Sequence, residues 1–153
     1  MNSKKHDDAM NEETVFRSMA SHYLVCHIAD CPLSSRCLRH IVGRYADPSP
    51  VACLSVNPLN PGVRETPCRM FREKVRVVMK RGMTNFYFDM PGRTEHAIRY
   101  QLIEIFGRKQ YYQMRRGDRL ITPDEQEQIA AVCRAHGWTA PLVYDGEEED
   151  WLW

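Results

Sequence analysis

The chain has 153 residues, 43% of them hydrophobic, with 21 Lys and Arg against 20 Asp and Glu. A chain of this length forms one domain, or at most two, and buries a core without disulfides. Its polar start, MNSKKHDDAMNEE, argues against a secretory signal. No apolar run approaches the roughly 20 residues that a membrane helix needs. These features predict a cytoplasmic protein that does not bind membranes, and a reducing cytosol disfavours a disulfide framework.

Charge is unevenly distributed along the chain. Residues 1–63 carry six basic and six acidic side chains, residues 64–119 carry fourteen and six, and residues 120–153 carry one and eight. Such segregation predicts either a surface that binds a polyanion or internal pairing of the basic and acidic segments.

Local patterns in the first half predict two helices and a strand. Residues 1–12 are short, polar and terminal, so we expect disorder there. Apolar residues recurring every four positions predict a helix over 14–24. The segment 26–31 is expected to form a loop, and Pro32 suits the first position of a second helix. Residues 51–56, VACLSV, are typical of a buried strand.

The second half carries clearer signals. Alternation predicts a strand over 75–79, and a helix over 94–106 follows, whereas 109–116 fits a short helix or a strand. Thr122-Pro123-Asp124-Glu125 is a capping box with proline at the first helical position, so a helix to about His136 is expected. The two longer helices are expected to pack together through one apolar set: Ile98, Leu102, Phe106, Ile129 and Val132.

These elements predict an α+β fold, a helix-rich single domain with a small sheet that includes both strands. The domain is expected to span residues 13–143, between the disordered N-terminus and an acidic aromatic tail, 144–153. We also expect a metal site formed by four cysteines to staple it.

The expected metal ligands are four of the six cysteines: Cys26, Cys31, Cys37 and Cys68. Thiolates are good ligands for zinc, but these spacings match no common zinc finger. Iron–sulfur clusters tolerate more varied spacing, so zinc and an iron–sulfur cluster both stay open as cofactors. Buried free thiols or a redox disulfide are the alternatives. Cys53 and Cys133 lie in apolar patterns and are expected in the core, and His27 and His40 are alternative ligands that are expected on the surface.

A resemblance supports this choice of cysteines. The four ligands, Pro32, Asn57-Pro58 and the block FGRKQYYQMRRGDRLITPDEQEQI together are similar to an uncharacterised family of small bacterial proteins, domain of unknown function 6078. The similarity covers residues 20–153. After the fourth cysteine the family has Pro-Tyr-Phe, where this chain has Arg69-Met70-Phe71. The resemblance implies the four cysteines as a set and implies no activity.

A second set of residues predicts nucleic-acid binding, because basic groups neutralise phosphates and aromatic rings stack on bases. Its members are Arg108, Lys109, Tyr111, Tyr112, Arg115, Arg116 and Arg119. The order helix, Gly107, short segment, Arg116-Gly117, capped helix is also similar to helix-turn-helix repressors, although the short segment has about two residues fewer than a recognition helix. The alternative is a solvated face paired with the acidic tail.

Three functions follow from these patterns. The first is a metal-stapled, regulatory protein that binds DNA or RNA. The second is an iron–sulfur or redox protein, and the third is a protein-interaction module whose metal is purely structural. No catalytic motif occurs, so an enzymatic role stays open and a regulatory role is favoured. Self-association and protein partners also stay open.

Overall fold

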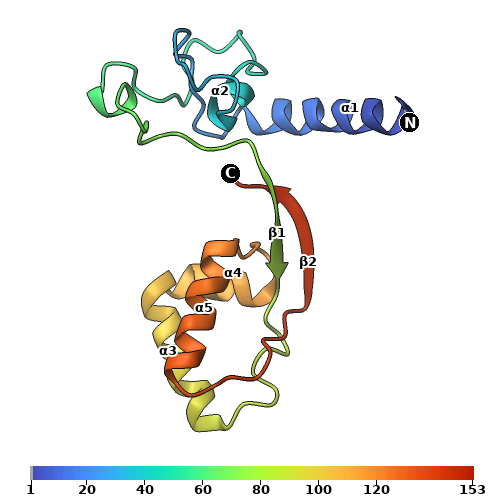
Figure 1. Ribbon diagram of the computed structural model, residues 1–153, viewed down its shortest axis with the longest axis vertical. Helices are drawn as coiled ribbons and strands as arrows, with labels where there is room; N and C mark the ends of the chain where they lie inside the picture. The colour runs from blue at the N-terminus through green and yellow to red at the C-terminus, as the bar shows by residue number, and fades with distance from the viewer. Residues whose placement is uncertain (1) are drawn as a thin grey trace. The chain divides into compact units, whose positions relative to one another are not determined.

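The computed structural model describes the backbone of residues 2–153 and the side chains from Asn11 onward. The described residues form five α-helices, a 3-10 helix and a two-stranded sheet (Figure 1), which confirms the α+β class. Contacts divide the chain into two compact units. The first comprises the residues up to Lys74 together with Trp153, and the second comprises Val75–Leu152. Each unit has its own hydrophobic cluster.

Two helices and a short turn of 3-10 helix order the first unit. Helix α1, Asn2–Met19, includes most of the segment 1–12 for which disorder was expected, while Met1 lies outside the described residues. Helix α2, Leu38–Gly43, is shorter than predicted, because residues 32–36 form turns instead of a helix from Pro32. The 3-10 helix η1 spans Pro61–Val63.

The aromatic core of the first unit includes the last residue of the chain. The Phe16 side chain is fully buried, and the Trp153 ring lies 6.1 Å from it and 5.4 Å from the Tyr23 ring, both in edge-to-face contacts. Such aromatic pairs contribute about 0.5–1.5 kcal/mol beyond burial alone.

The predicted strand over 51–56 is wrong. Among the described residues, one isolated parallel bridge, between Val25 and Ser55, involves this stretch, and the Val51 and Leu54 side chains are exposed. A strand is stabilised by its partners, and within the described chain this segment meets only Val25 through backbone bonds, from Val25 N to Leu54 O and from Val56 N to Val25 O. Val56 is the one residue of the stretch that is buried.

The second unit combines the sheet with three helices. Strand β1, Arg76–Arg81, pairs antiparallel with β2, Gly146–Trp151, so that Arg76 lies opposite Trp151. Helices α3, Gly92–Phe106, α4, Arg108–Arg116, and α5, Pro123–Ala135, lie between the strands in sequence. Figure 1 shows β1 and β2 side by side, so the segment predicted as a tail supplies half of the sheet.

The helix predictions for this unit are confirmed. Helices α3 and α5 share one core, and the ambiguous segment 109–116 is helical. The Thr122 hydroxyl accepts from the Glu125 backbone N–H while the Glu125 carboxylate accepts from the Thr122 N–H, the reciprocal capping box that the sequence indicated. The predicted contact residues are buried or, for Phe106, partly buried against that core: Ile98, Leu102, Phe106, Ile129 and Val132.

Candidate functional site

The four cysteines predicted as ligands line a single small cavity of the first unit. Its volume is about 20 Å³, and its other walls are mostly apolar side chains with one histidine, His40. Two of the thiols, Cys26 and Cys37, are buried, whereas Cys31 and Cys68 are half-buried and also line a more open pocket of about 150 Å³ beside it. The cavity is therefore closed on the side of the first pair and reached from the side of the second.

Backbone hydrogen bonds hold the cysteine-bearing segments together. The Cys26 N–H donates to the Arg39 carbonyl at 3.0 Å, and the Leu38 N–H donates to the Arg72 carbonyl at 2.7 Å. The Arg39 guanidinium donates to the carbonyls of Leu24 at 2.8 Å and Met70 at 3.0 Å. One side chain on α2 thus ties the segment before Cys26 to the segment after Cys68. Sequence reasoning missed this role because the partners of Arg39 are 15 and 31 residues away.

The thiols affect one another electrostatically. Burial is the main cause that raises the pKa of Cys26 above its ordinary value; a backbone hydrogen bond from Ile28 lowers it, and Cys37, Cys31 and Cys68 raise it further. A negative charge on a neighbouring sulfur would therefore disfavour the Cys26 thiolate, whereas a cation beside it would favour that form.

The prediction that His40 lies on the surface is wrong, because its half-buried side chain lines the same cavity. It lies three positions after Cys37, the N-cap residue that precedes α2, and both residues line the cavity. Its Nδ1 atom is buried and makes no hydrogen bond within the described residues. Burial first, and then Arg44 and His27, lower the His40 pKa, so the ring stays neutral near pH 7. A neutral imidazole nitrogen is a metal donor, and an unpaired buried one costs about 1–3 kcal/mol.

The remaining cysteines have different environments. Cys53 is exposed, which corrects its predicted place in the core, and its sulfur lies 3.9 Å from Nε2 of the exposed His27. Cys133 is 1% exposed in the core of the second unit, as predicted, and burial raises its pKa to about 11.

The chemistry of these donors suits a metal ion, but their geometry does not. Thiolates with an imidazole nearby form a zinc or iron–sulfur donor set by their chemistry. As the side chains stand, however, no group of three or more His, Cys, Asp or Glu residues among those described could hold a metal ion. Rotation about χ1 moves a cysteine sulfur without moving the backbone. The donors therefore share a cavity without being placed for coordination.

The basic and aromatic residues of the second unit do not form one surface. Tyr111 is 1% exposed, and its hydroxyl lies 3.0 Å from that of Tyr87 in the core. The Arg119 guanidinium donates twice to the Glu125 carboxylate, at 2.6 and 3.1 Å, and so braces the capping box. Arg116 pairs with Asp118 at 2.8 Å. Three of the seven predicted residues are thus engaged by neighbours in the fold.

The other four lie on or beside the outer side of α4. Arg108 and Lys109 are exposed, and the Arg108 guanidinium lies 5.6 Å from the Tyr112 ring centroid. Arg115 is half-buried with its guanidinium 5.8 Å from the Tyr87 ring. No ion pair to Arg108 or Lys109 occurs among the side chains described. Among the basic residues of α4, Arg108 and Lys109 are therefore the exposed ones without an ion pair in the described chain.

The acidic tail is paired with β1 rather than with this surface. Lys80 contacts Glu147 at 2.6 Å, and Arg81 forms an ion pair with Glu148, both across the sheet. The predicted internal pairing of basic and acidic segments therefore exists, but its basic partner lies in 76–81 and not in 108–119.

Comparison with known proteins gives one family. A family model described as "Family of unknown function (DUF6078)" matches residues 9–153. Neither the curated proteins nor the solved structures contain a match to the chain. Within the described residues, every helix is too short or too polar to cross a membrane.

Proposed function

The chain belongs to the DUF6078 family of unknown function, which carries no activity over to it, and we propose from its geometry that the first unit binds one zinc ion. The ligands would be Cys26, Cys31, Cys37 and Cys68, in a site that staples the unit. The observation that carries the proposal is that these four thiols, up to 42 positions apart, line one cavity.

The size of the cavity favours a single ion over a cluster. A volume of about 20 Å³ is close to that of one small occupant, since roughly 10–15 Å³ suffices for one water. An iron–sulfur cluster, with several iron and sulfide ions, would require these walls to move apart. The four sulfur atoms would have to move together to reach the zinc–sulfur distance of about 2.3 Å, which side-chain rotation allows.

A bound ion would stabilise the first unit, which has little regular secondary structure beyond α1. Between α1 and the end of the unit, the regular elements are the six residues of α2 and the three of η1. Ordering the long irregular segments between them costs about 1–2 kcal/mol per residue in backbone entropy. Metal ligation compensates such costs in small domains, because the site forms only in the folded state. A structural role, without chemistry at the metal, is therefore the one that this irregular local structure supports.

The test compares two cysteine substitutions in anaerobically purified protein. Cys37→Ser should lower zinc content and the melting temperature together, whereas Cys53→Ser, at an exposed thiol outside the cavity, should change neither. The comparison is clean because Cys37 is the N-cap of α2 without a capping hydrogen bond, and serine is a favoured N-cap. Loss of stability would therefore report the lost ligand.

Metal analysis decides between the alternatives. Stoichiometric zinc supports the proposal, and stoichiometric iron with acid-labile sulfide would replace it by the iron–sulfur hypothesis. Wild-type protein that contains neither metal, and whose melting temperature does not respond to added zinc, would refute both. Cobalt substitution of the wild type and of His40→Asn would show whether His40 is also a ligand, because loss of a nitrogen ligand changes the visible d–d bands, whereas the charge-transfer band reports only the number of thiolates.

A second candidate function rests on the open cations of α4. We propose that Arg108 and Lys109, with Tyr112 beside them, contact the phosphates of DNA or RNA. The supporting observation is that the acidic tail pairs with β1 and leaves these two side chains without a carboxylate partner in the described chain. A regulatory role would follow from such binding.

Salt-dependent binding tests this candidate. Each phosphate contact contributes about 0.9 to the slope of log K against log salt on duplex DNA. The double substitution Arg108→Gln with Lys109→Gln should therefore reduce that slope by roughly 2. The control removes two positive charges from α3 and α5 through Arg93→Gln and Arg134→Gln, and should leave the slope nearly unchanged. No binding by the wild type at about 50 mM salt would exclude the candidate.

A further inference from the structure

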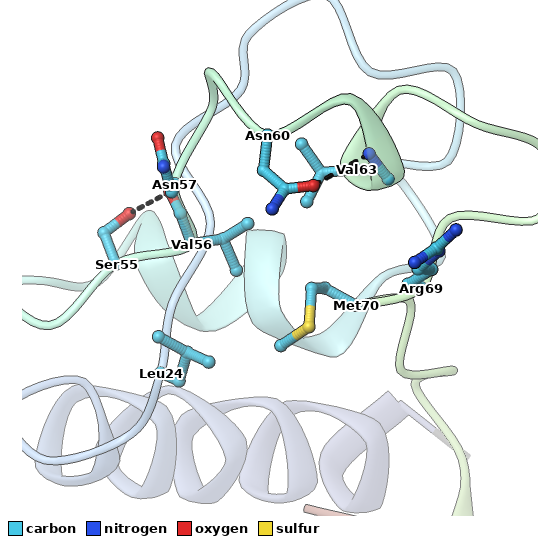
Figure 2. A pocket seen from close by; sticks show the side chains of 9 residues that line it. Leu24, Ser55, Val56, Asn57, Asn60, Val63, Arg69 and Met70 are labelled. Carbon is cyan, nitrogen blue, oxygen red and sulfur yellow. Dashed lines mark hydrogen bonds between the residues drawn. The ribbon is translucent and has the colours of Figure 1, made fainter.

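A second and larger pocket of the first unit has no cysteine in its walls. Its volume is about 310 Å³, at the lower end of the range for small-ligand sites. Figure 2 shows an apolar floor formed by Leu24, Val56 and Met70, with Val63 beside them. Val56 and Val63 are buried and the other two are half-buried, so the floor would shield an apolar group from water.

Hydrogen bonds between its walls make this pocket a formed feature of the fold. Arg39 donates to the main-chain carbonyls of Leu24 and Met70, which fixes two sides of the floor. The Val56 N–H donates to Val25 O at 2.8 Å, and the Arg69 N–H donates to Gly62 O at 3.2 Å. A ligand would therefore enter a site that is already ordered.

The polar groups at the rim present donors. The Asn60 Oδ1 accepts from the Gly62 N–H at 2.9 Å, and the Asn57 Oδ1 accepts from the Leu59 N–H at 3.0 Å. Only the carbonyl oxygen of an amide side chain can accept from a backbone N–H, so both amides are fixed with their NH₂ groups unused by these bonds. Figure 2 shows the Asn60 nitrogen directed toward the space above Val56 and Met70.

The charged groups at the rim of the pocket also favour an anionic ligand. Arg69 lies at the edge of the pocket and donates through Nε to Glu65 at 3.3 Å, which leaves its terminal nitrogens outside that bond. No carboxylate lines the pocket among the residues described. Amide and guanidinium donors above an apolar floor match an anionic acceptor group attached to an apolar body.

We propose that this pocket binds a small organic carboxylate. The apolar chain lies on Leu24, Val56, Val63 and Met70, and the carboxylate accepts from the Asn60 amide at the rim, with Asn57 and Arg69 adding to its stabilisation. The assignment does not depend on a metal in the neighbouring cavity, because none of the proposed metal ligands contributes to these walls.

The test titrates the full-length protein with hexanoate and follows amide shifts by nuclear magnetic resonance. Saturable shifts at Val56, Asn60 and Met70, at millimolar hexanoate, are the expected result. 1-Hexanol, with the same chain and no charge, should bind at least tenfold more weakly. Equal binding of the two compounds would overturn the carboxylate assignment, and no saturable shifts, or shifts confined to other residues, would overturn the site itself.

Asn60→Asp is the decisive variant. Its side chain keeps an oxygen for the Gly62 N–H, so the turn is retained, but the donor NH₂ becomes a negatively charged oxygen. Hexanoate affinity should fall at least tenfold. Arg69→Gln, at an exposed position, is a second test and should lower hexanoate affinity a few-fold. Wild-type affinity in Asn60→Asp would overturn the proposed binding mode.

Discussion

Replacement of Ile129 by alanine tests the core that joins α3 and α5. The Ile129 side chain is 1% exposed and belongs to the hydrophobic core cluster of the second unit. Removing three of its carbon atoms loses about 0.8 kcal/mol each in burial, or about 2.4 kcal/mol. Incomplete collapse of the surrounding helices adds a cavity cost, so the expected loss is about 3–4 kcal/mol in the free energy of unfolding.

The matched control is the same substitution at an exposed site. Ile105 on α3 is 46% exposed, so much less apolar contact is lost there, and alanine is the better helix former. Ile105→Ala should therefore cost less than about 1 kcal/mol. Urea unfolding followed by tryptophan fluorescence measures both, because Trp138 packs against the same cluster as Ile129. Equal costs for the two variants would show that α5 does not bury Ile129.

Three further predictions concern the same unit. Thr122→Ala removes the hydroxyl that accepts from the Glu125 N–H, and should lower stability by about 1 kcal/mol in thermal unfolding. A hydrogen bond from Lys80 and its charge lower the pKa of Glu147, so this carboxylate stabilises the fold above its unfolded pKa of about 4.5. That contribution is lost as pH falls through the lowered folded value, so melting curves of wild type and Glu147→Gln should differ at pH 7 and converge in acid. Because burial raises the pKa of Cys133 to about 11, iodoacetamide at pH 8 should modify it far more slowly in folded than in urea-unfolded protein, as mass spectrometry would show.

The acidic tail forms β2, so its deletion is not a clean test of whether its charge opposes nucleic-acid binding. Deleting residues 145–153 would remove β2 and expose one side of β1, so the truncated protein would differ in fold as well as in charge. Point substitutions on α4, which leave the sheet intact, separate these effects.

Local signals in the sequence determined the helices of the second unit. Thr122 and Glu125 interact within one turn, and the apolar spacing of α3 and α5 describes a face of each helix without reference to the rest of the chain. For the same reason the grouping of Ile98 with Ile129 was predictable once both helices were recognised. In the first unit, the pattern and family resemblance selected the same four cysteines that line the cavity.

Tertiary structure decided everything that depends on a distant partner. The stretch 51–56 has the composition of a strand but has no neighbouring strand among the described residues. The acidic segment 146–151 becomes a strand because β1 supplies opposite charges and a backbone edge. Tyr111 sits among basic residues in sequence and faces Tyr87 in the core, and His40 lines the cavity of the thiols from a short helix. Composition describes a residue's own chemistry, but burial and pairing are set by contacts that only the folded chain brings together.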